Sequence, residues 1–73
     1  MPYDNKQIAK RLQDTAQGEY YDGNSLLVAK DIPGITEYEK SILEAWLTGT
    51  FNRDPFEYRM RLQDIAIKIR FMD

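Results

Sequence analysis

Between residues 54 and 71 the apolar side chains fall on two opposite sides of a helix rather than on one. Successive residues of an α-helix are about 100° apart around its axis. At that spacing one stripe consists of Phe56, Met60, Ile67 and Phe71, and the opposite stripe consists of Tyr58, Leu62, Ile65 and Ile69. We call them the Phe56 stripe and the Tyr58 stripe. Asp54 is a good N-cap, and Pro55 suits the first helical position. We therefore predict a helix over 55–71 that has to be covered on both sides.

The end of this segment also fits a strand, because apolar residues alternate with other residues from Ile65 to Phe71. The approach from Asp54 is long and contains neither Gly nor Pro after Pro55, which favours the helix.

Two other segments carry the start and stop residues of helices. Asp4 or Asn5 can cap a helix over 4–17, and Gly18 can end it. Its apolar stripe is narrow and contains Ile8, Leu12 and Ala16. Because these residues are small or few, we expect this helix to rest one edge on the core.

The segment 36–48 begins with the capping box formed by Thr36 and Glu39, and Gly49 follows it. It has a broad apolar arc that includes Trp46, the only tryptophan. We therefore expect it to be the central packing element and the neighbour of helix 55–71.

The segment 25–32 is ambiguous, since its short apolar run fits either a helix or a strand. A cap at Asn24 or Ser25 and the absence of a convincing second strand favour a short helical turn near 25–30. The chain is thus predicted to be all-α, with one domain over 1–73 built from three main helices (about 4–17, 36–48 and 55–71) plus this turn. The expected core contains one stripe of the last helix and Ile8, Leu12, Leu26, Leu27, Ile42, Leu43 and Trp46.

Composition removes several classes of function. The 73 residues include no Cys and no His, so disulfides, thiolate metal sites and the commonest general base are excluded. The glycines are scattered singly at turns, so there is no phosphate-binding loop. Among the clustered carboxylates, Glu37, Glu39, Asp54 and Glu57 lie at helix starts, where negative charge is favoured. No apolar run reaches the roughly 18 residues that span a bilayer. We expect a cytoplasmic protein that is not an enzyme and uses no metal, cofactor, membrane or small-molecule substrate.

The function that the sequence favours is a small interaction module, such as a regulator, inhibitor or adaptor. One apolar stripe of helix 55–71 would contact another protein or a second copy of the chain in a homodimer. Aromatic residues and Met are enriched at interfaces, which favours the Phe56 stripe as the exposed one. The predicted partner-binding residues are therefore Phe56, Met60, Ile67 and Phe71, together with Tyr20 and Tyr21 of the loop over 17–24. The competing arrangement sandwiches helix 55–71 between the other two main helices, so that no stripe is left free.

The alternative is a small nucleic-acid-binding or transcription-regulatory protein that uses Arg59, Arg61, Lys68 and Arg70 of the last helix. The segment from Gln7 to Leu12 resembles the first helix of a helix-turn-helix, but the acidic residues that follow supply no recognition helix. The four basic residues are also divided between the two polar seams of helix 55–71. With ten basic and twelve acidic residues the net charge is −2, so bulk charge does not favour nucleic acid.

Overall fold

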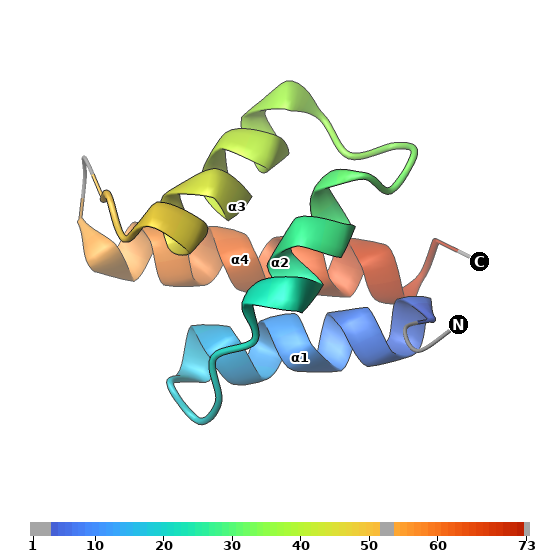
Figure 1. Cartoon of the computed structure of the whole chain (residues 1–73), viewed down its shortest axis with the longest axis horizontal. Coiled ribbons are helices and arrows are strands. Elements are labelled where there is room, and N and C mark those ends of the chain that lie inside the picture. Colours follow the sequence, from blue (N-terminus) through green and yellow to red (C-terminus); the bar gives the residue numbers. More distant parts are fainter. Residues whose placement is uncertain (1–3, 52–53, 73) are drawn as a thin grey trace.

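The computed structural model describes residues 4–51 and 54–72, and every regular element in these ranges is a helix (Figure 1). The elements are α1 (Asn5–Gln17), α2 (Gly23–Lys30), α3 (Glu37–Thr48) and α4 (Pro55–Arg70). The predicted all-α class is confirmed, but the count of main helices is corrected from three to four. The segment expected to be only a turn near 25–30 is a helix of eight residues.

The helices begin and end where their capping residues are. The Asp4 carboxylate accepts the Gln7 N–H at 2.8 Å, and the predicted capping box of Thr36 and Glu39 is present. Asp54 accepts the Phe56 N–H at 3.0 Å, with Pro55 as the first residue of α4. The ends of α1 and α3 are capped by glycines in the left-handed conformation, Gly18 at φ 79° and Gly49 at φ 72°.

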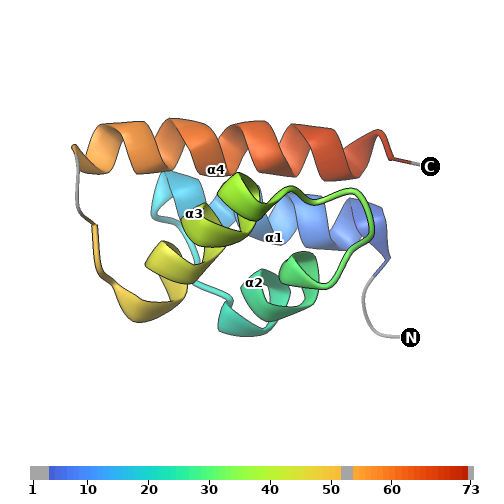
Figure 2. The ribbon, with the colours of Figure 1, turned by 90° about the horizontal axis from the view of Figure 1, so that it is seen from above.

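The longest packing contact joins the first and last helices. α1 and α4 lie side by side and antiparallel, while α2 and α3 cross this pair on one side of it (Figure 2). The expected contact of α3 with α4 is present, but the main neighbour of α4 is α1, which was expected to rest only one edge on the core. The reason is that the small residues of α1, which made its stripe look thin, let the two backbones approach closely. Ala9, Ala16 and Ala66 are all at most 3% exposed along this contact.

Most of the expected core is buried, and the two exceptions are Leu27, which is exposed, and Trp46, which is partly buried. Ile8, Leu12, Leu26, Ile42 and Leu43 are each at most 5% exposed. Leu27, however, is 52% exposed, because a short helix buries only one side and α2 uses Ser25, Leu26 and Ala29 for it.

Trp46 is only partly buried and closes the edge of the core. Its Nε1–H donates to the Tyr58 carbonyl oxygen at 3.2 Å, and its ring meets that of Phe51 edge-on, 5.2 Å between centroids. This contact ties the end of α3 to the start of α4. Within the described ranges, none of the helices has the length and apolar character needed to cross a lipid bilayer.

Candidate protein-interaction surface

The two apolar stripes of α4 have different environments. The Tyr58 stripe is buried: Tyr58 is 8% exposed, Ile65 2%, and Leu62 and Ile69 not at all. The Phe56 stripe is exposed, at 60% for Phe56, 44% for Met60, 48% for Ile67 and 77% for Phe71. The sandwich arrangement is therefore contradicted: α1 and α3 both contact the inner side of α4. We call the exposed stripe of Phe56, Met60, Ile67 and Phe71 the outer face.

The outer face lies on the side of α4 turned away from the other helices. In Figure 2 this helix forms one border of the molecule, and nothing in the described ranges covers its far side. Four large apolar side chains within about 60° around the helix axis make a ridge along α4, in contrast to the isolated apolar residues of ordinary surfaces.

The ridge has a basic edge on the side of α1. Arg59 and Arg70 are both exposed along this edge. Arg70 also lines a hollow of about 300 Å³ together with Lys6 and Lys10 of α1. At the opposite end of the same edge, Arg59 and Phe56 line a second hollow beside the end of α1. Positive charge is thus gathered where α1 and α4 meet.

The edge on the side of α3 carries charges of both signs. Glu57 and Asp64 lie there, each lining a hollow that is shared with Tyr38 and Ile42 of α3. Asp64 Oδ2 is 3.9 Å from the guanidinium of Arg61, an exposed pair on the same edge. The outer face is therefore an apolar ridge with a basic edge on the α1 side and an edge of mixed charge on the α3 side.

The remaining basic residue of this edge, Lys68, is turned toward α3. Its Nζ donates to Glu39 Oε1 at 2.8 Å and to the Gly34 carbonyl oxygen at 2.9 Å. Partial burial raises the pKa of Glu39, but the hydrogen bonds and charge of Lys68 and the Thr36 N–H outweigh it and leave that pKa below its ordinary value. Lys68 thus links α4 to the start of α3 through these two hydrogen bonds, whereas Arg59 is exposed on the other edge.

The four basic residues of the nucleic-acid alternative are consequently not brought together. Arg59 and Arg70 lie on the α1 side of the ridge, whereas Arg61 and Lys68 lie on the α3 side with carboxylate partners. The sequence did not indicate that Lys6 and Lys10 of α1 add positive charge to this edge. They become neighbours of Arg70 only in the folded chain.

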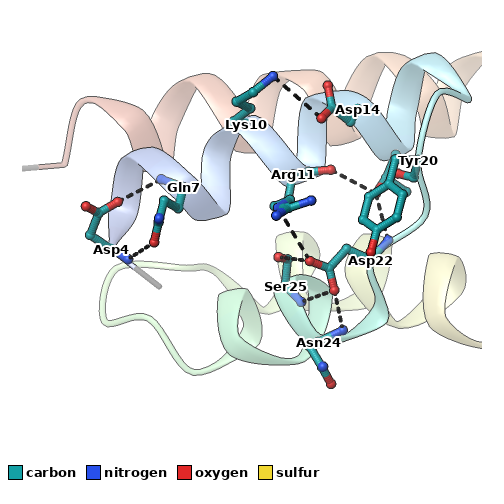
Figure 3. Close-up of polar contacts among 10 residues, drawn as sticks. Asp4, Gln7, Lys10, Arg11, Asp14, Tyr20, Asp22, Asn24 and Ser25 are labelled. Carbon is teal, nitrogen blue, oxygen red and sulfur yellow. Dashed lines mark hydrogen bonds and ion pairs between the residues drawn. The ribbon is translucent and has the colours of Figure 1, made fainter. Parts of the chain in front are cut away.

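Tyr20 and Tyr21 are exposed but do not join the outer face. The guanidinium of Arg11 stacks over the Tyr20 ring, 5.2 Å from its centroid, on the opposite side of α1 from α4 (Figure 3). The Tyr21 hydroxyl donates to the Trp46 carbonyl oxygen at 3.5 Å, linking the α1–α2 connection to the end of α3. The contacts described for Tyr20 and Tyr21 are therefore made within the chain, away from the outer face.

A polar cluster beneath Tyr20 was also missed by the sequence reasoning. Asp22, only 9% exposed, caps α2 and accepts the Ser25 hydroxyl at 2.9 Å (Figure 3). The Thr15 hydroxyl accepts the Asp22 N–H at 3.4 Å and lies within donating distance of the Arg11 and Tyr20 carbonyl oxygens. Because these buried groups satisfy one another, the cluster fixes the angle between α1 and α2. The sequence predicts the cap of this helix at Asn24 or Ser25, and the structure corrects it to Asp22, within the segment expected to be a loop over 17–24.

Within residues 4–51 and 54–72, no group of three or more acidic side chains is arranged to hold a metal ion. No protein-family model matches the chain, and neither a curated protein nor a solved structure is significantly similar to it.

Proposed function

We propose that this chain is a non-enzymatic protein–protein interaction module, a regulator, inhibitor or adaptor, whose contact surface is the outer face of α4. The observation that carries the proposal is that Phe56 and Phe71 are 60% and 77% exposed in the same ridge as Met60 and Ile67. A small domain gains stability by burying such residues, so leaving four of them outside costs stability that a partner can restore.

The shape of the surface defines the partner. A ridge along a helix packs best against the ridge or groove of another helix. The partner helix would present an apolar stripe, with acidic residues opposite Arg59 and Arg70 and basic residues opposite Glu57 and Asp64. Unlike charges around an apolar centre favour one orientation and exclude other partners.

The test compares two exposed apolar residues. Phe56→Asp alters the outer face, whereas Val28→Asp, at a residue that is 36% exposed on α2, introduces the same charge elsewhere. Tagged wild-type protein and both variants are expressed in the native cell and crosslinked. We expect the same crosslinked species, a second copy included, with wild type and Val28→Asp, and their loss with Phe56→Asp.

The site is then located by oxidation with hydrogen peroxide. In the isolated complex Met60 should be oxidised more slowly than in the free chain, while Met72, which packs against the core, serves as the internal reference. Crosslinked species that persist in Phe56→Asp, or a Met60 oxidation rate unchanged by assembly, would contradict the proposal.

One observation favours nucleic acid as a second candidate. Lys6, Lys10 and Arg70 line one hollow, and Arg59 continues the positive charge along the same edge. If this edge binds phosphates, duplex affinity should fall steeply with salt and should drop in Lys10→Glu. A protein that does not bind a duplex at low salt excludes this candidate.

A further inference from the structure

We infer that the hollow between α1 and α4 beside Arg70 is a binding site for a terminal phosphoryl group or a pyrophosphate group, held by Lys6, Lys10 and Arg70. The inference goes beyond the proposed function, because it uses no residue of the outer face. It follows from three cations that belong to distant segments of the chain and line the same small hollow.

The antiparallel pairing of the first and last helices brings these cations together. The start of α1 and the end of α4 lie at the same end of the molecule (Figures 1 and 2). Lys6 and Lys10 are four residues apart, so their side chains leave α1 on the same face, and Arg70 belongs to the last turn of α4. All three are exposed and line one hollow of about 300 Å³. An anion in this hollow can therefore be contacted from both helices.

The other residues of the hollow are small or neutral. Ala9 is 3% exposed and contributes only a methyl group, which leaves space between the longer side chains. Gln13 lines the hollow three residues after Lys10, and its amide can donate two further N–H groups. Among the described residues, none that lines this hollow carries a carboxylate. The lining therefore supplies hydrogen-bond donors and positive charge, which are the groups that an anion needs.

The three cations are available to a ligand. In the part of the chain that the structure describes, neither Lys6 nor Arg70 forms an ion pair. Lys10 Nζ lies 3.7 Å from Asp14 Oδ2, which is beyond hydrogen-bond distance, and the Lys10 side chain is 76% exposed. The Arg70 guanidinium is 5.9 Å from the centroid of the Phe71 ring, near the outer limit of a cation–π contact. A bound anion would thus compete with weak contacts only.

The number of cations favours a phosphoryl group over an anion with a single charge. A terminal phosphoryl group carries about −1.5 to −2 charges at pH 7 and has three strong acceptor oxygens. A carboxylate or a single phosphodiester carries one negative charge and would leave two of the three cations without a partner. The guanidinium of Arg70 can donate two parallel N–H groups to phosphate oxygens, while Lys6 and Lys10 act as point charges. The nucleic-acid candidate differs, because it needs cations strung along the edge and not gathered in one hollow.

The first experiment titrates the full chain with pyrophosphate, with sodium chloride adjusted to hold the ionic strength constant, and follows backbone and side-chain amides by nuclear magnetic resonance. We expect one saturable site, with the largest shifts at Lys6, Lys10, Gln13 and Arg70. Lys6→Gln, Lys10→Gln and Arg70→Gln should each weaken binding by roughly five- to tenfold, because each removes one charged donor. Lys40→Gln, the same change at a lysine of α3 with a 42% exposed side chain, is the control and should bind like wild type.

The second experiment looks for a gain of affinity. Asp14→Asn removes the carboxylate that the structure pairs with Lys10, and it should tighten pyrophosphate binding about two- to threefold. A variant that folds poorly cannot produce this gain, so the result separates a ligand site from a role in stability. Asp64→Asn is the matched control, because it removes a carboxylate that lies 3.9 Å from Arg61 on the α3 side of the ridge. It should leave the affinity unchanged, and an equal gain in both variants would overturn the inference.

A third experiment identifies the source of the phosphoryl group. The chain is sedimented with phosphatidylcholine vesicles that contain or lack a phosphoinositide. Binding that requires the phosphoinositide and is weakened in Lys6→Gln assigns the phosphoryl group to a lipid headgroup. Pyrophosphate binding without vesicle binding assigns it to a soluble phosphorylated molecule.

The remaining outcomes overturn the inference. Shifts that do not saturate, or that are as large at basic residues outside the hollow, would show only general attraction of anions. Equal affinity of Lys40→Gln and the three hollow variants would do the same. A DNA duplex that displaces pyrophosphate and binds more tightly at the same salt would show that phosphodiesters are the ligand. Phe56→Asp should bind pyrophosphate like wild type, so the proposed function and this inference can fail independently.

Discussion

Ile67 and Ile69 are two residues apart on α4 and lie on opposite sides of it, Ile67 with 48% of its surface exposed and Ile69 with none. Both are large aliphatic residues in the same helix, and their difference comes only from what surrounds them. Ile69 is packed inside the four-helix core, whereas Ile67 belongs to the outer face. The chain therefore covers one apolar side of its last helix and leaves the other exposed.

The same substitution at these two positions should give opposite results. Ile69→Asp places a charge in the core and should cost at least about 4 kcal/mol, enough to unfold a domain of this size. Ile67→Asp should change the free energy of unfolding by no more than about 1 kcal/mol, the cost of a poorer helix former at an exposed site. Urea unfolding followed by Trp46 fluorescence measures both. Equal destabilisation of the two variants would show that Ile67 is also a core residue.

The neighbouring leucines of α2 test the correction to the predicted core. Leu26 is fully buried and Leu27 is 52% exposed. Leu26→Ala should cost about 2–5 kcal/mol because it leaves a cavity, and Leu27→Ala should cost about 0.5 kcal/mol or less. Thermal unfolding of the two variants side by side checks this, and a larger effect at Leu27 would contradict the orientation of α2.

The pair formed by Glu39 and Lys68 should make stability depend on pH. Because the pKa of Glu39 is lowered by folding, its charge stabilises the native state above the ordinary value of 4.5, and this contribution is lost as the pH falls from there through the lower pKa of the folded chain. Glu39→Gln retains an acceptor for the Thr36 N–H but removes the charge. At pH 7 it should lower the free energy of unfolding by roughly 0.5–1 kcal/mol, with the difference vanishing in acid.

Urea unfolding of wild type and Glu39→Gln between pH 3 and 7 provides the measurement. Lys68→Met, which removes the cation instead, should show the same convergence in acid. A difference between wild type and Glu39→Gln that is equally large at low pH would show that the charge of Glu39 is not the cause.

Capping residues made the helices predictable from the sequence. Which helices pack against one another was not predictable in this way. Asp4, Thr36 and Asp54, with Gly18 and Gly49, act locally, and each is used as expected. The choice of α1 over α3 as the main neighbour of α4 depended on how closely two backbones approach. The small buried residues Ala9 of α1 and Ala66 of α4 together allow this close approach. The pattern of either segment alone does not reveal it.

The candidate surface was partly predictable for a similar reason. Periodicity alone separated the two stripes of α4, and the preference of interfaces for aromatic residues and Met pointed to the exposed one. The placement of Tyr20 and Tyr21 away from it depended on the path of the α1–α2 connection, which Asp22 and Thr15 fix through tertiary hydrogen bonds. The basic edge required α1 and α4 to be side by side before Lys6 and Lys10 could be counted with Arg70.

Sedimentation equilibrium of wild type, Ile67→Asp and Val28→Asp over the same concentrations tests the outer face most directly. We predict that wild type and Val28→Asp fit one monomer–dimer constant, whereas Ile67→Asp stays monomeric and unfolds at nearly the wild-type urea concentration. Equal association of all three proteins, or of none, would contradict self-association through the outer face of α4.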